Sequence, residues 1–252
     1  MQTMTGVAAY ALRLGDDALV LTQRLSEWSS RAPELEEDVA LTNIALDLLG
    51  QARSLLTYAA ELEGAGRTED DLAYLRDERE FTNVQLVEQP RGDFAVTIAR
   101  QLLFSTYQQL LYTSLRSSTD PTLSAIAAKA VKEVAYHVDH AEQWTRRLGD
   151  GTAESHARMQ AGLDAMWPFV AELFEADDLV RGLAADGVAV DPSTLQPEWD
   201  RRVDAVLAAA TLTRPTPTWT ARGGRSGIHS EHMGFLLAEL QHLHRSHPGA
   251  TW

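Results

Sequence analysis

Cysteine is absent from this chain of 252 residues. Its absence excludes a disulfide framework, a thiolate metal site and a cysteine nucleophile. No apolar run reaches the roughly 18 residues that a membrane-spanning helix needs. The N-terminal sequence, with its early base at Arg13 and acids at Asp16 and Asp17, is not typical of a secretory signal. We therefore expect a cytoplasmic protein with no membrane partner.

Basic residues are also scarce, with 22 Lys and Arg against 36 Asp and Glu, which gives a net charge of -14. Because the electrostatic field of this negative net charge repels polyanions, we expect no nucleic-acid partner. The Arg222–Gly227 segment combines glycines with two arginines, a chemistry that attracts phosphate, but it lacks the P-loop lysine and a preceding strand. A flexible connection is the preferred interpretation. The run Arg76–Glu80 is typical of a solvated, salt-bridged surface.

Signals for β-strands are nearly absent, and no Gly-x-Ser-x-Gly motif supports serine catalysis. Ala, Leu, Glu, Arg and Gln dominate long stretches whose apolar residues recur at three and four, which predicts helices. Asp93 and Asp120 are suited to N-caps, Pro121 to a first turn and Gly149 to a C-terminal stop. The expected helices cover about 5–29, 34–64, 94–115, 121–148, 154–175 with an interruption at Pro168, 177–185, 198–212, and from 226 or 227 to 247.

The second of these helices carries a long apolar stripe that we expect to be buried. Trp28, Trp144, Trp167 and Trp199 are expected in the core or at an interface. Without a repeat or a long linker, the pattern predicts one all-α domain over 1–252, a ferritin-like helical bundle with additional C-terminal helices. The predicted stripe consists of Leu35, Val39, Ile44, Leu48, Leu49, Ala52, Leu55, Leu56, Ala59 and Leu62.

Bundles of this kind often hold two irons, with Glu-x-x-His pairs on two of the helices. One such pair occurs here, Glu239 to His242, as often as chance allows. At the mid-bundle positions the motif would need a histidine three residues after each carboxylate. Gly50 stands three residues after Asp47 instead, and Tyr136 stands three residues after Glu133. A two-iron site is therefore not expected.

Other histidines leave weaker alternatives open. Glu133, His137 and His140 share a helix face and could form a mononuclear site, although an ordinary hydrogen-bonded imidazole is the preferred interpretation. The segment His229–His232 is interpreted as capping or partner contacts rather than as a metal site. His242, His244 and His247 fit cations at the negative end of a helix.

Four blocks that together cover nearly the whole chain resemble the C subunits of bacterial phenylacetyl-CoA epoxidases. Their length and order make this likeness far more specific than a short motif. The blocks are LRLGDDALVLTQRLSEWSSRAPELEEDVALTNIALDLLGQARSLLTYAAEL, RDEREFTNVQLVEQPRGDFAVTIARQ, KAVKEVAYHVDHAEQWTRRLGDGT and GGRSGIHSEHMGFLLAEL.

The resemblance implies a structural, non-catalytic subunit with no catalytic residue, metal or cofactor of its own. It implies a heterodimer with a catalytic A subunit, whose di-iron centre inserts oxygen into phenylacetyl-CoA, and a higher-order A/C assembly. A B subunit and a reductase subunit with FAD and iron-sulfur centres complete the complex that the resemblance implies.

The resemblance also implies two contacts with the coenzyme A part of the substrate. The first would involve Glu80, Phe81, Thr82 and Asn83, and the second Arg181, Gly182 and Leu183. A different class of function, a self-sufficient metal-dependent oxidase of the ferritin-like class, would instead use Glu133, His137, Glu231, His232 or Glu239.

Overall fold

The computed structural model describes the backbone of residues 2–250 and the side chains of residues 6–250. Within this range the chain forms helices joined by turns and loops, and no β-strand occurs. The predicted all-α class is confirmed. The chain divides into two compact units, unit 1 with residues 1–90 and 223–252, and unit 2 with residues 91–222. The single domain expected over 1–252 stays a prediction.

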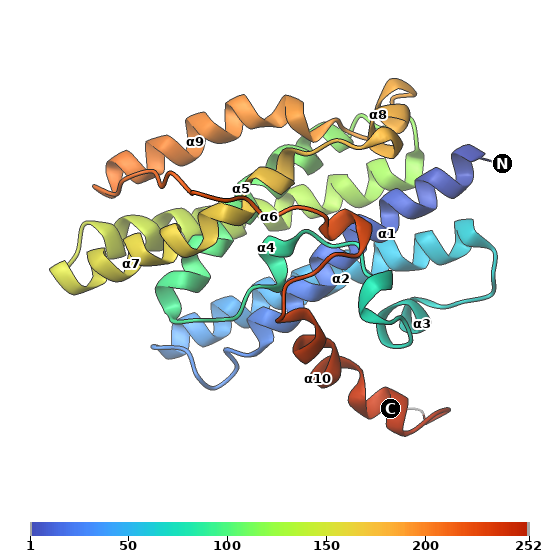
Figure 1. The fold of residues 1–252 in the computed structure, drawn as a ribbon, viewed down its shortest axis with the longest axis horizontal. Coiled ribbons are helices and arrows are strands. Elements are labelled where there is room, and N and C mark those ends of the chain that lie inside the picture. Colours follow the sequence, from blue (N-terminus) through green and yellow to red (C-terminus); the bar gives the residue numbers. More distant parts are fainter. Residues whose placement is uncertain (1, 251–252) are drawn as a thin grey trace. The chain divides into compact units, whose positions relative to one another are not determined.

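Unit 1 is built on two long helices that lie side by side, α1 and α2 (Figure 1). Gly15 of α1 favours this close packing, because a Cβ atom there would lie 2.8 Å from the Leu56 side chain and would displace it. The elements of unit 1 are α1 (Gln2–Ser26), α2 (Leu35–Glu63), α3 (Glu69–Tyr74), the 3-10 turn η1 (Glu78–Glu80), α4 (Gln85–Glu88), the 3-10 turn η5 (Gly224–Ser226) and α10 (Met233–Ser246).

The apolar stripe predicted for α2 is correct in its centre and wrong at its start. Ile44, Leu48 and Leu55 are fully buried, whereas Leu35 is 76% exposed and Val39 is 54% exposed. The buried residues continue at intervals of three and four through Leu41 and Glu37, so Leu35 and Val39 fall on another face of the helix.

Unit 2 is built around α5, which packs on α6, α7 and α9. Its elements are α5 (Phe94–Leu115), α6 (Pro121–Gly149), α7 (Ala153–Met166), the 3-10 turns η2 (Trp167–Phe169) and η3 (Ala171–Phe174), α8 (Asp178–Ala185), the 3-10 turn η4 (Pro192–Leu195) and α9 (Gln196–Ala209).

Both predicted N-caps of unit 2 are confirmed. The Asp93 carboxylate accepts a hydrogen bond from the Val96 backbone amide at 3.0 Å. The Asp120 carboxylate accepts bonds from the amides of Thr122 and Leu123 at 3.0 and 2.9 Å, and Pro121 is the first residue of α6. Each carboxylate satisfies amides that would otherwise lack a helical partner.

The other end of α6 differs slightly from the prediction. Gly149 is the last helical residue rather than the residue that follows the helix. It is required for a different reason, since a Cβ atom there would collide with the carbonyl oxygen of Ala210. The core of unit 2 includes the fully buried Trp199, whose indole donates a hydrogen bond to the Leu103 carbonyl at 3.0 Å.

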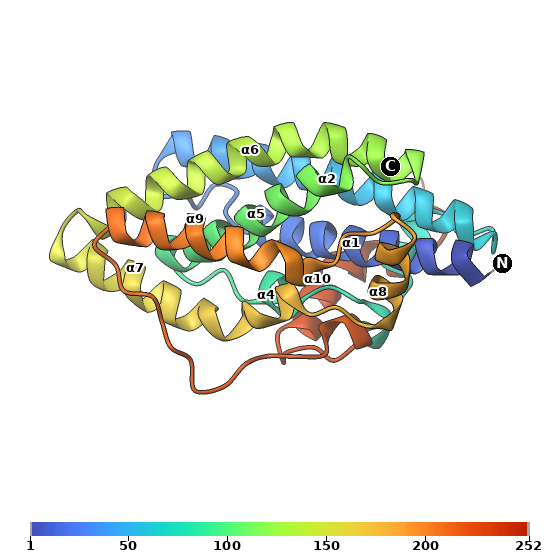
Figure 2. The ribbon, with the colours of Figure 1, turned by 90° about the horizontal axis from the view of Figure 1, so that it is seen from above.

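The last helix begins later than predicted, at Met233 instead of Ser226 or Gly227. Residues 213–223 carry no helix and run as an extended segment (Figure 2). The residues between η5 and α10 hold hydrogen bonds to distant partners, described below, that a regular helix would break. In the range that the structure describes, we find no helix with the length and apolar character needed to span a bilayer.

Candidate functional site

The histidine and carboxylate clusters weighed as metal sites do not come together. Among the described residues, no three His, Asp or Glu side chains form a group that could hold a metal ion. Glu133 pairs with Lys129 at 3.6 Å, and His137 is almost fully buried. The ring of His140 lies 6.2 Å from that of Tyr136.

The densest polar chemistry lies instead around two adjacent carboxylates of α1. Asp16 is completely buried and accepts hydrogen bonds from both terminal nitrogens of Arg76, at 3.1 Å for Nη1. It also accepts from the backbone amide and the hydroxyl of Thr82, at 2.8 and 3.0 Å. Four donors therefore neutralise this carboxylate, as a buried charge requires.

This arrangement corrects the interpretation of the Arg76–Glu80 run as a solvated surface at its first residue only, because the residues from Asp77 to Glu80 are exposed. Arg76 is only 3% exposed, and its guanidinium lies 4.1 Å above the centre of the Phe81 ring. Its Nη1 atom also donates to the Glu80 carbonyl at 2.9 Å. The segment after α3 is thereby fixed to α1 through the arginine.

Asp17, the second carboxylate of the pair, binds Arg225 from the other end of the sequence. The guanidinium donates two hydrogen bonds to it, at 2.7 and 3.0 Å, and the Val84 amide donates a third at 2.9 Å. Burial raises the pKa of Asp17 above its usual range, although the charge and hydrogen bonds of Arg225 act in the opposite direction.

The Arg222–Gly227 segment is thus more than the flexible connection that its composition suggested. Arg225 also donates to the carbonyls of Arg13 and Thr82, at 3.2 and 3.0 Å. Gly227 has a left-handed φ of 72°, and a Cβ atom there would collide with the carbonyl of Arg79. Both features hold this segment against the rest of unit 1.

A third buried pair joins Glu88 of α4 to His229. The side chains of both residues have no exposed surface, and Nδ1 of His229 lies 2.8 Å from Oε2 of Glu88. The other ring nitrogen lies 3.0 Å from the carbonyl oxygen of Phe81. Glu88 also accepts from Asn83 Nδ2 at 3.0 Å and from the Ser230 amide.

The partners of His229 define its charge. A carboxylate and a carbonyl can only accept hydrogen bonds, whereas a neutral imidazole has a single N–H donor. Donation to both requires the imidazolium form. Burial lowers the pKa of His229, but the hydrogen bonds to Glu88 and Phe81 and the charge of Glu88 outweigh it, so the pKa is raised.

These three pairs, which we call the buried ion network, consist of Asp16–Arg76, Asp17–Arg225 and Glu88–His229. Each carboxylate in the network is already neutralised by a cation of the same unit. Such groups can anchor loops, but they are poor metal ligands or general bases because their lone pairs are occupied. Two of the pairs fix Arg76 and Arg225 to α1, and the third joins Glu88 of α4 to His229.

The first predicted coenzyme A contact lies beside this network, in unit 1. Phe81 and Asn83 are fully buried, and Thr82 binds Asp16. Only Glu80 has an exposed side chain, and its carboxylate accepts a hydrogen bond from the Asp77 amide at 2.7 Å. The structure therefore commits most of these side chains to internal contacts.

The second predicted contact lies on α8, in unit 2. Arg181 is exposed, with a 3.0 Å ion pair to Asp178 and a hydrogen bond to the carbonyl of Ala176. Gly182 borders open space, and Leu183 is buried. The two predicted coenzyme A contacts therefore lie in different units, the first in unit 1 and the second in unit 2.

Sequence reasoning missed the network because its members are scattered among ordinary surface patterns. Arg76 stands in a run of charges, and Glu88 follows a short apolar stretch. One signal was present: Asp16 and Asp17 interrupt a leucine-rich helix, where a buried carboxylate needs a partner. That signal predicts a buried ion pair without naming its cation.

Comparisons with known proteins agree on the kind of protein. Residues 2–252 match the model of a family described as "Phenylacetic acid catabolic protein". The chain is 52% identical to the C subunit of the 1,2-phenylacetyl-CoA epoxidase of Escherichia coli strain K12, over 99% of this chain and 100% of that protein. The ferritin-like class predicted above is the fold of this family. Because both matches cover almost the whole chain, this protein belongs to the family of phenylacetic acid catabolic proteins.

Proposed function

We propose that this chain is the structural, non-catalytic subunit of a multicomponent phenylacetyl-CoA epoxidase in aerobic phenylacetate degradation. In this proposal it pairs with the catalytic di-iron subunit, and the resulting assembly works with a B subunit and a flavin and iron-sulfur reductase in the cytoplasm. The observation that carries the proposal is the buried ion network, whose carboxylates are all neutralised by Arg76, Arg225 and His229.

The chemistry of the network explains why we favour a structural role. A di-iron oxygenase needs several carboxylates and imidazoles free to bind metal at one place. Here Gly50 and Tyr136 occupy the positions where the mid-bundle motif would need histidines. The carboxylates of the buried ion network instead hold segments of the chain in place.

An apolar strip on α2 is the surface that we assign to the catalytic subunit. Leu35, Val39 and Leu46 are 76%, 54% and 58% exposed and lie at spacings of four and seven on one helix face. Exposed large apolar side chains gathered on one face mark an interaction site more often than scattered ones do. The name of the E. coli relative, as one subunit of an epoxidase, supports a protein partner of this kind.

Adding charge to this strip should weaken the pairing. We expect Val39→Asp together with Leu46→Asp to weaken association with the co-expressed catalytic subunit at least tenfold, because two carboxylates would be buried unpaired. Sedimentation or interferometry measures the affinity. Ala205→Asp with Ala208→Asp, two exposed positions on α9, adds the same charge elsewhere and should leave the affinity unchanged.

Iron analysis of the same samples tests the non-catalytic role. We expect the chain purified alone to carry no stoichiometric iron and the pair to carry iron in proportion to the catalytic subunit. Stoichiometric iron in the isolated chain, lost in Glu133→Ala with His137→Ala, would contradict the proposal and support the self-sufficient oxidase. Unchanged pairing in the α2 variant would exclude that strip as the contact.

We further propose that the pair contacts the coenzyme A portion of phenylacetyl-CoA through this chain. The segment Glu80–Asn83 and the α8 residues Arg181–Leu183 are the proposed contacts. A phosphorylated ligand needs a local cation here, because the net charge of -14 repels it. Arg181 supplies an exposed guanidinium whose only ion-pair partner among the described residues is the fully exposed Asp178.

Arg181→Ala should therefore weaken phenylacetyl-CoA binding by the intact pair by about 1 to 3 kcal/mol, the range for a charged hydrogen bond. Calorimetry on the intact pair provides the measurement. Arg201→Ala, which removes another exposed arginine with an acidic neighbour, is the matched control and should bind normally. Equal affinities for Arg181→Ala and the unaltered pair would remove Arg181 from the proposed contact.

A further inference from the structure

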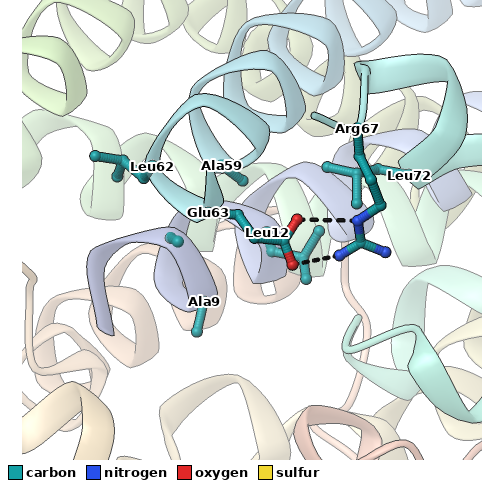
Figure 3. A pocket seen from close by; sticks show the side chains of 8 residues that line it. Ala9, Leu12, Ala59, Leu62, Glu63, Arg67 and Leu72 are labelled. Atoms are coloured by element: carbon teal, nitrogen blue, oxygen red, sulfur yellow. Dashed lines mark hydrogen bonds and ion pairs between the residues drawn. The ribbon is translucent and has the colours of Figure 1, made fainter. Parts of the chain in front are cut away.

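A small cavity opens in unit 1 between the first turns of α1 and the last turns of α2 (Figure 3). Its volume is about 210 Å³. That is below the roughly 300 to 1,000 Å³ of pockets for drug-sized ligands. The cavity therefore suits a ligand about the size of a single ring. The lining residues are Ala8, Ala9, Leu12, Ala59, Leu62, Glu63, Arg67 and Leu72.

Small side chains produce this hollow. At Gly15 the two helices approach so closely that the Leu56 side chain fills the space between them. About two turns earlier in α1, the lining residues are Ala8 and Ala9, with Ala59 on α2. Methyl groups cannot reach across the gap, so an apolar space stays open between two well-packed helices.

An ion pair forms the polar edge of the cavity. Arg67 donates through Nε to Oε2 of Glu63 at 2.9 Å and through Nη2 to Oε1 at 2.5 Å. Figure 3 shows both bonds and the remaining terminal nitrogen directed away from the carboxylate. That nitrogen, Nη1, has no hydrogen-bond partner among the described residues. It can only donate, so it selects a ligand with an acceptor.

The surrounding charges decide which acceptor fits. The hydrogen bonds from Arg67 to Glu63 raise the pKa of the guanidinium, burial lowers it, and the charges of Glu63, Glu80 and Asp71 raise it further. A second carboxylate at this edge would face these acids and the net charge of -14. An uncharged carbonyl receives the hydrogen bond without that repulsion.

We propose that this cavity is a binding site for a small uncharged ligand with one ring and a carbonyl acceptor, such as an aromatic carboxamide. The ring occupies the space beside Ala9 and Leu12, and the carbonyl oxygen accepts from Nη1 of Arg67. The proposal concerns unit 1 of the isolated chain and does not depend on the function proposed above.

Three probes of equal shape separate the parts of this proposal: benzamide is neutral, benzoate is an anion, and benzamidinium is a cation without an acceptor. Each is titrated into the isolated full-length chain, with methyl NMR on the cavity alanines and leucines and calorimetry as readouts. We expect saturable benzamide binding with shifts confined to the cavity, and at least fivefold weaker binding of the other two.

Two variants locate the site. Ala9→Leu fills the hollow from a half-buried position and should weaken benzamide binding at least tenfold, while Ala128→Leu, at an exposed alanine of α6, should not. Arg67→Met should weaken it about fivefold, as expected for one hydrogen bond from a guanidinium that Glu63 already neutralises. Arg53→Met, which removes an exposed arginine beside Glu69, is its control.

Thermal unfolding and circular dichroism check that Ala9→Leu is folded. If Ala9→Leu does not fold, Arg67→Met still tests the site. No saturable shifts at the cavity up to the solubility limit of benzamide would overturn the proposal. Equal binding of benzoate or benzamidinium would overturn the assignment of an uncharged acceptor. If Arg67→Met bound benzamide as tightly as the unaltered chain, the proposed role of the guanidinium would be overturned.

Discussion

Asp16→Ala is expected to lower the free energy of unfolding by about 3 to 5 kcal/mol, the usual cost of breaking a buried ion pair. The variant leaves Arg76, which is 3% exposed, as a buried cation without its carboxylate. It also removes the acceptor for the amide and hydroxyl of Thr82. Both losses act on the segment that follows α3, so unit 1 should lose stability first.

Urea unfolding followed by circular dichroism measures this effect. Glu154→Ala is the control, because it breaks a 2.6 Å ion pair with Arg158 in which both side chains are largely exposed. Exposed pairs of this kind contribute about 0 to 1 kcal/mol. If the two variants lost similar stability, the buried pair would have no special role.

Glu88→Gln is expected to destabilise the protein strongly at low pH and less at high pH. At pH 6 the loss should be about 3 to 5 kcal/mol, because the buried imidazolium of His229 loses its counter-ion. The pKa of His229 is raised in the folded protein, so its contribution is complete below the unfolded value of about 6.5. That contribution disappears as the pH rises through the folded pKa.

The stability of the unaltered protein should therefore decline above neutral pH, while Glu88→Gln lacks this decline. Urea unfolding at pH 6 and pH 9 should show the difference between the two proteins becoming smaller at the higher pH. Glu231→Gln is the control, because Glu231 is exposed and lies 3.9 Å from the half-exposed His232. A difference that stays constant with pH would mean that His229 is neutral in the folded state.

Local signals in the sequence were sufficient for most helices. Asp93, Asp120 and Pro121 predicted two helix starts correctly, because capping depends on residues that are close in the chain. The ferritin-like class followed from the helical pattern and from the resemblance, which the comparisons confirm. The predicted coenzyme A contacts stay predictions.

The parts that were predicted wrongly depend on distant partners. Arg76 looked like a surface residue because its partner Asp16 is 60 positions away. The start of the last helix was placed too early because His229 binds Glu88 across 141 positions. A periodicity argument cannot contain such contacts, so it placed the start of α10 too early. Leu35 and Val39 were placed in the core for a different reason, because they lie off the helix face along which the buried residues continue.

The discontinuity of unit 1 has a consequence for the order of synthesis. Its two parts end at Pro90 and resume at Gly223, so the ribosome must add the whole of unit 2 before Arg225 and His229 appear. At about 5 to 20 residues per second, this interval lasts roughly 7 to 27 seconds. Until then Asp17 and Glu88 lack their cations, and of the two α1 carboxylates only Asp16 already has its partner, Arg76. A nascent chain halted before residue 223 should therefore be accessible to proteases and chaperones. Unit 1 should complete its folding only after the full chain is released, and later than unit 2.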